Sequence, residues 1–159
     1  MAKYLVLLFF LFITSCKTTE VVTRDTSNLD TVVFDAVSKS LNFSEYEKNN
    51  ANQIAKELIY EWYNNQIKTN GFEGQLEINV SKIETVSEKL DNYFKITANI
   101  LIDFKLENTT LKSKKSYTVE ATEFAEISGS FSILDQENLT ANVVRLALKK
   151  ITNKINTLI

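Results

Sequence analysis

The sequence contains no histidine, no proline, three glycines and a single cysteine. Without histidine, the chain has neither a histidine general base nor a histidine metal ligand. The lack of proline and the scarcity of glycine predict long, uninterrupted helices and strands. One cysteine cannot form an internal disulfide, yet 159 residues are enough to bury a core without one.

The charged residues are balanced, with 18 lysines and arginines against 20 aspartates and glutamates. A nucleic-acid-binding domain needs a clearly basic face, so we expect no nucleic acid partner. The chain also lacks a GxSxG motif, a glycine-rich phosphate loop and any metal-spaced ligand cluster. We therefore expect a protein that is not an enzyme and that uses no cofactor and no metal.

The N-terminal segment has the pattern of a secretion signal. Lys3 precedes an unbroken apolar run, Tyr4–Ile13, which is shorter than the roughly 20 residues that span a bilayer. The run ends in Ile13-Thr14-Ser15-Cys16, which resembles the lipobox of bacterial lipoproteins. The resemblance implies that residues 1–15 are a signal peptide and that Cys16 carries the lipid. An ordinary cleaved signal, or a cysteine placed there by chance, is the alternative.

Lipidation would place the chain at a membrane. The chemistry of lipoproteins implies three acyl chains on Cys16, and two already give stable anchoring. Lys17 follows the cysteine, and its resemblance to enterobacterial sorting signals favours the outer membrane over the inner membrane. The domain would then face the periplasm.

The mature chain divides into a tether and one domain. Residues 16–28 are mostly polar and predict a lipid-anchored tether of roughly 20 Å if they form a flexible coil. Residues 29–159 predict a single domain. Residues 29–41 fit either a strand or a helix, and the β-branched pair Val32 and Val33 favours a strand.

Two segments have helical periodicity. Ser44 and Glu47 have the spacing of a capping box, and apolar residues recur at helical spacing up to an Asn70-Gly71 stop, so residues 44–69 predict an amphipathic helix. A second apolar stripe, from Leu139 to Leu158, predicts a C-terminal helix.

Three segments alternate like strands. Leu76–Val80 predicts the first, and its phase slips before Ile83, which indicates a bulge or a bend. Tyr93–Leu106 is apolar at every second position and predicts a long strand with one buried face. A turn through Asn108-Thr109 leads to the returning strand, Leu111–Glu126. The predicted register pairs Leu106 with Leu111, Ile100 with Tyr117, Ala98 with Val119, Ile96 with Ala121 and Asp103 with Lys114.

These segments predict an α+β fold with the order β-α-β-β-β-α. A mostly antiparallel sheet of three to four strands, with two amphipathic helices packed on one face, would bury every apolar stripe.

The hairpin provides the main candidate binding residues. Four lysines should converge around its tip, where they can contact lipid phosphates or an acidic partner; these are Lys105, Lys112, Lys114 and Lys115. Alternatively, the lysines only protect the tip against aggregation.

Other candidates have a structural interpretation that we favour. Glu120, Glu123 and Glu126 recur every three residues and could mark a cation site, but a solvated strand end is the simpler interpretation. Asp103 falls on the polar face of its strand, which argues against catalysis. Trp62 should belong to the core, with Tyr60 and Tyr63 beside it.

The order of elements resembles small envelope lipoproteins of the YajG type and the LPS-assembly lipoproteins of the LptE type. The stretches that carry the resemblance are Asn52–Asn70, Tyr93–Thr122 and Leu139–Ile159. It implies a non-catalytic accessory or scaffold subunit that binds a protein partner in the envelope. A lipid- or LPS-binding module that acts through the lysine-tipped hairpin is the alternative.

Overall fold

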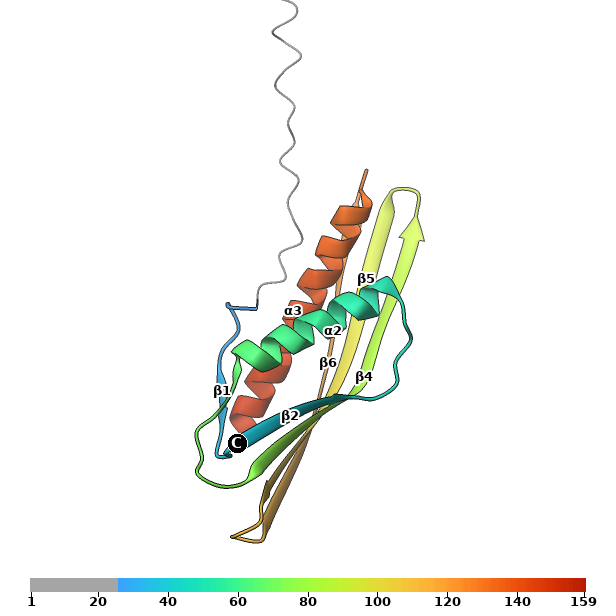
Figure 1. The fold of residues 1–159 in the computed structure, drawn as a ribbon. Coiled ribbons are helices and arrows are strands. Elements are labelled where there is room, and N and C mark those ends of the chain that lie inside the picture. The colour runs from blue at the N-terminus through green and yellow to red at the C-terminus, as the bar shows by residue number, and fades with distance from the viewer. Residues whose placement is uncertain (1–25) are drawn as a thin grey trace, which may run out of the picture.

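The computed structural model describes residues 26–159 (Figure 1). The predicted signal peptide, Cys16 and most of the predicted tether lie outside the described residues. The elements are β1 (Val32–Phe34), β2 (Ser38–Phe43), α2 (Asn50–Asn65), β3 (Ile67–Thr69), β4 (Gln75–Leu90), β5 (Tyr93–Asn108), β6 (Ser113–Ser128) and α3 (Ile133–Leu158).

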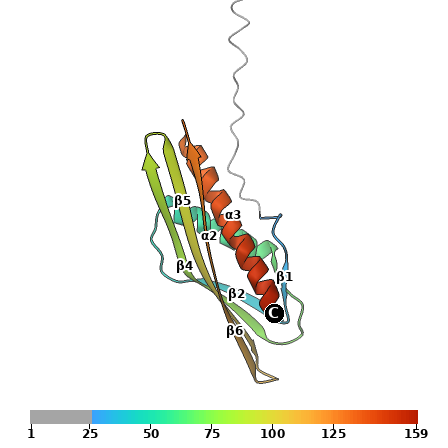
Figure 2. The same ribbon diagram turned by 180° about the vertical axis from the view of Figure 1, so that it is seen from behind.

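The main sheet has four strands in the order β2-β4-β5-β6. β4, β5 and β6 are antiparallel to one another, and β2 lies parallel to β4 at the edge. β1 and β3 form a separate parallel pair. Both helices lie on the same face of the sheet, and no described element covers the other face (Figures 1 and 2). The predicted α+β class is confirmed.

The core lies between the sheet and the two helices. Trp62 is fully buried and meets Phe104 edge to face with 6.4 Å between ring centroids, while Phe34 stacks on Phe104 at 5.8 Å. The indole nitrogen of Trp62 donates to the hydroxyl of Thr152 at 2.9 Å, so its polar atom is satisfied inside the core. The predicted core position of Trp62 is confirmed.

The first helix begins later than predicted. Its N-cap is Asn49, whose side chain accepts a hydrogen bond from the backbone of Asn52 at 2.7 Å. The predicted cap, Ser44, instead extends the course of β2, because its N–H donates to the carbonyl of Val80 at 3.0 Å. Asparagine and serine are about equally good caps, so the strand contact of Ser44 and the bonds of Asn52 to Thr85 place the start of the helix at Asn49.

The same helix also ends earlier than predicted. Residues 67–69 form β3 and not a last helical turn. Ile67 pairs with Val32 and Thr69 with Phe34, so β-branched residues find a strand partner that is distant in sequence. Residues 29–41 accordingly contain β1 and the first four residues of β2, which confirms the strand interpretation.

The hairpin register differs from the prediction by four residues. The structure pairs Leu106 with Lys115, Asp103 with Thr118, Ile100 with Ala121, Ala98 with Glu123 and Ile96 with Ala125. The shift arises because the turn between Asn108 and Ser113 is wider than a tight two-residue turn. The side chain of Asn108 accepts from the N–H of Leu111 at 2.9 Å, and Lys112 adopts a φ of 51°. An even shift leaves every side chain on its predicted face.

The predicted phase slip in β4 is confirmed as a register shift between Val80 and Lys82.

Local contacts set two further boundaries. The packed part of the chain begins no later than Thr26, which is buried and whose carbonyl accepts from Gln66 at 3.1 Å. α3 starts at a capping box formed by Ser132 and Asp135.

Candidate functional site

The β5–β6 hairpin projects beyond the rest of the domain and carries the four predicted lysines (Figures 1 and 2). Lys114 pairs with Glu107, and the ammonium of Lys105 lies 4.0 Å from the carboxylate of Glu77. The hydrogen bond from Lys114 lowers the pKa of Glu107. Lys115 stands opposite Leu106 and therefore on the other face of the hairpin. The lysines surround the tip, and two of them are partly neutralised.

Two exposed apolar side chains lie at the same end of the molecule. Leu111, in the hairpin turn, is 73% exposed, and Phe72, in the β3–β4 loop, is 97% exposed. The loop touches the hairpin, because a Cβ atom on Gly74 would lie only 2.9 Å from the carbonyl oxygen of Glu107. The sequence analysis missed Phe72; its position in a glycine-bounded, otherwise polar turn was the available signal.

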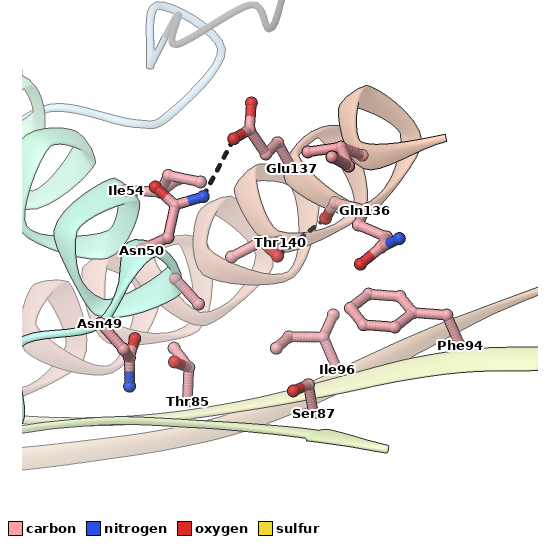
Figure 3. A pocket seen from close by; sticks show the side chains of 12 residues that line it. Asn49, Asn50, Ile54, Thr85, Ser87, Phe94, Ile96, Gln136, Glu137 and Thr140 are labelled. Carbon is pink, nitrogen blue, oxygen red and sulfur yellow. Dashed lines mark hydrogen bonds between the residues drawn. The ribbon is translucent and has the colours of Figure 1, made fainter. Parts of the chain in front are cut away.

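A second candidate site is a cleft between the helices and the sheet (Figure 3). Its volume is about 290 Å³. Phe94 and Ile96 of β5 form an apolar floor, and Ile133, which is 74% exposed, stands at the start of α3 on the rim. The side chain of Asn50 donates to Glu137 at 2.9 Å and joins the two helices there.

The N-terminal turns of both helices and β4 form the polar wall of the cleft. It includes Asn49, Thr85, Ser87, Gln136 and Thr140. These residues come from three elements that are far apart in the sequence, so no local motif indicated the cleft. A concave site with an apolar floor, neutral polar walls and one carboxylate, that of Glu137, is suited to binding.

One buried asparagine holds the cleft in shape. The Asn52 carbonyl oxygen accepts from the backbone N–H of Thr85 at 3.0 Å and from its hydroxyl at 2.9 Å. The Asn52 amide nitrogen donates to the carbonyl of Glu47 at 2.7 Å. This side chain therefore fixes the β2–α2 linker and the start of α2 against the edge of β4.

Asp103 lies on the polar face of β5, as predicted. Its carboxylate accepts from the hydroxyl of Ser81 and from the hydroxyl of Thr118 at 2.6 Å. These two hydrogen bonds, followed by the charge of Lys105, lower the pKa of the Asp103 carboxyl. The Asp103 carboxylate of β5 therefore joins Ser81, at the bulge of β4, to Thr118 of β6.

The three glutamates of β6 do not converge. Glu123 points to the helix side and pairs with Lys150, whereas Glu126 accepts from the hydroxyl of Tyr93 at 3.2 Å. Residues three apart on a strand point to opposite faces, so the spacing that indicated a cation site separates the carboxylates. Within residues 26–159, no group of three or more acidic, cysteine or histidine side chains could hold a metal ion.

The tyrosines next to Trp62 have structural contacts. The Tyr63 hydroxyl donates to the carbonyl of Lys39 at 3.0 Å. The ammonium of Lys39 lies 4.2 Å from the Tyr63 ring centroid and donates to the carbonyls of Tyr63 and Ile67, both at 2.6 Å. Burial, with a smaller contribution from Lys68, lowers the pKa of Lys39. Tyr60 remains largely exposed beside Tyr63.

In the part of the chain from residue 26 onward, neither helix is long and apolar enough to cross a membrane.

Comparisons with known proteins give distant structural likenesses. No protein-family model and no curated protein sequence matches the chain. A minor lipoprotein from Acinetobacter baumannii is 13% identical, covers 77% of this chain and 89% of its own, and has a TM-score of 0.38. A Xanthomonas campestris protein of the DUF330 family is 13% identical, with coverages of 81% and 85% and a TM-score of 0.40. Neither likeness assigns a function to this chain.

Proposed function

We propose that the chain is a lipid-anchored, non-catalytic lipoprotein of the bacterial envelope. It would be held at the outer membrane by Cys16, with the domain facing the periplasm. There it serves as an accessory or scaffold subunit that binds a protein partner in envelope assembly or transport. The observation that carries this proposal is the sequence Ile13-Thr14-Ser15-Cys16 directly after a short apolar run.

The chemistry of the described domain supports binding over turnover. The chain has no histidine, and three of the four carboxylates considered as candidate sites have structural partners. Asp103 accepts from two hydroxyls, Glu123 pairs with Lys150 and Glu126 accepts from Tyr93. The cleft offers polar groups, one of them the carboxylate of Glu137, above an apolar floor, which is an arrangement for recognition.

Membrane fractionation of Cys16→Ser tests the anchor. The wild-type protein should remain with the outer membrane through a high-salt wash and leave it only in detergent, because acyl chains hold it by hydrophobic burial. The Cys16→Ser variant should be absent from the salt-washed membrane. Retention of that variant to the wild-type extent would contradict the proposal.

A second function, lipid or LPS binding through the hairpin tip, is favoured by one observation. Phe72 and Leu111 are exposed beside the lysines of the tip. An apolar side chain flanked by lysines suits the boundary between acyl chains and anionic head groups.

Vesicle binding by an unlipidated protein that begins at Lys17 tests this second function. Each lysine near an anionic surface contributes on the order of 1 kcal/mol, so replacing Lys112, Lys114 and Lys115 by alanine should weaken binding to phosphatidylglycerol-containing vesicles about tenfold or more. Alanine at three lysines elsewhere serves as the charge-matched control, for which Lys48, Lys68 and Lys149 are suitable. Equal binding of the two triple variants would exclude a specific role for the tip.

A further inference from the structure

The second half of β4 has a neighbouring strand on one side only. β2 pairs with β4 along Gln75–Val80, and the register shift between Val80 and Lys82 follows directly. From Lys82 to Leu90, β5 is the only strand paired with β4 among residues 26–159. Figure 1 shows β4 running on well past the end of β2. Asn52 occupies the outward N–H of Thr85, so the free edge of β4 is the part that follows Thr85.

The hydrogen bond of Asn52 shows which backbone groups face this edge. The N–H of Thr85 donates to the Asn52 side chain, so it points away from β5. Backbone groups alternate in direction along an antiparallel strand, so those of Ser87 and Lys89 point the same way. The turn agrees, because Leu90 and Tyr93 close a two-residue hairpin loop, where the closing pair is hydrogen-bonded. Ser87 and Lys89 thus present N–H and C=O groups outward.

The cleft adjoins this same edge. The side chain of Ser87 lines the cleft, next to Ile96 and Phe94 of β5 (Figure 3). Side chains of a strand placed beside Ser87 would point alternately to the two faces of the sheet. Those on the helix side would enter the cleft below Ile133. One extended ligand can therefore hydrogen-bond to the edge of β4 and, at the same time, place a side chain in the cleft.

The opposite edge of the sheet, β6, lacks this combination. Lys154 of α3 donates to the outward carbonyl of Glu120 at 2.5 Å, so part of that edge is occupied by the chain itself. α3 packs along the inner face of β6, and none of the cleft-lining residues belongs to this strand.

We propose that the free edge of β4 binds an extended segment of the partner protein. The segment adds a strand to the sheet, next to β4 and beyond the end of β2. The segment hydrogen-bonds to the backbone of Ser87 and Lys89 and places an apolar side chain in the cleft on Phe94 and Ile96. This inference rests on the proposed partner-binding function and specifies the chemistry of the partner: an exposed strand-forming peptide with an apolar residue at alternate positions.

The decisive variant pair is Ser87→Pro and Ser87→Ala in the full-length, lipidated protein. Proline is tolerated on a strand edge where the N–H faces solvent, so Ser87→Pro should fold with nearly unchanged circular dichroism. It removes the edge donor and places a ring where the added strand would lie. Alanine keeps the donor. A photo-crosslinking residue at Lys89, with a second series at Leu111 on the hairpin tip, reports on partner contact in intact cells.

We expect the Lys89 crosslink to a separate envelope protein to fall at least about tenfold in Ser87→Pro and to persist in Ser87→Ala. In the wild-type protein, the amide of Ser87 should also become protected from hydrogen exchange when that envelope protein is bound. Equal crosslinking of both variants would overturn the inference. So would a Lys89 crosslink only to a second copy of the chain or to its own residues 17–25.

A second variant covers the case in which Ser87→Pro does not fold. Ile133→Asp places a charge at the mouth of the cleft, and the first turn of a helix accepts an aspartate. It should reduce the Lys89 crosslink at least about tenfold, and an unchanged yield would overturn the inference. If Leu111 captures a partner while the Lys89 position does not, partner binding stands and strand addition fails. If neither position captures any protein, the proposed function itself fails.

Discussion

At the scale of single residues, polar side chains fix the geometry of the domain. The Trp62 indole bonds Thr152, Asn52 bonds Thr85 and Glu47, and Asp103 bonds hydroxyls on both neighbouring strands. Each removes the cost of an unpaired polar group in or near the core. The result is a rigid frame around the cleft and the free edge of β4.

Asp103 gives the domain a defined dependence on pH. Its pKa is lowered in the folded state, so its stabilisation is fully present above the unfolded value of about 3.9 and is lost as the pH falls through the lower folded value. Asp103→Asn should reduce the free energy of unfolding by about 1 kcal/mol at pH 7, a modest effect because solvent screens this site.

Urea denaturation between pH 7 and pH 2 measures this effect. The difference between wild type and Asp103→Asn should be constant down to about pH 5 and should shrink below about pH 4. In a Ser81→Ala background the same substitution should cost less, because one hydrogen bond is already gone. A difference that grows on acidification would contradict the assigned role of Asp103.

Residue positions were predictable where periodicity alone determines them. The alternation in β5 placed Asp103 on the polar face, and the helical stripe placed Trp62 in the core. The cleft residues could not be found in this way, because Phe94, Ser87 and Ile133 meet only through tertiary packing. The exposure of Phe72 likewise depends on the course of a loop.

At the scale of elements, the sequence predicted both helices and the three long strands, whereas β3, most boundaries and the hairpin register were not predicted. The long alternation predicted the β5–β6 hairpin, yet its register depended on a four-residue turn held by Asn108 and a left-handed Lys112. Residues 67–69 extended a helical pattern, but pairing of Ile67 with Val32 made them a strand. A partner distant in sequence decided between helix and strand for residues 67–69. The turn residues decided between two registers for the hairpin.

The end of α2 depends on a lysine from another element. Lys39 of β2 donates to the carbonyls of Tyr63 and Ile67 at 2.6 Å, where a cation also interacts favourably with the helix C-terminus. Replacing it with methionine should lower the free energy of unfolding by about 1–2 kcal/mol and speed hydrogen exchange in the last turn of α2.

Lys68→Met is the matched control for this substitution. Lys68 bonds one carbonyl of the same helix, that of Asn64, at 3.4 Å in an exposed position, so its loss should change stability by less than about 0.5 kcal/mol. Equal effects of the two substitutions would mean that Lys39 does not cap α2.

At the scale of the whole molecule, the sequence predicted an α+β domain with two helices on one face of a mostly antiparallel sheet, and the structure has that architecture. The packing leaves three features on its surface: a lysine-ringed hairpin tip, a cleft between helices and sheet, and a free edge of β4. None of the three resembles a catalytic centre. The hairpin tip has the charge and exposed apolar side chains of the proposed membrane contact, and the cleft and the edge of β4 belong to the proposed protein contact.

The central claim is that Cys16 anchors the protein to the envelope membrane. Intact mass spectrometry of the full-length protein, expressed in a bacterium and purified from its membrane fraction, tests it most directly. The account predicts a mature chain that begins at Cys16 and carries the added mass of three acyl chains. A chain that retains residues 1–15, or one cleaved elsewhere with an unmodified Cys16, would contradict it.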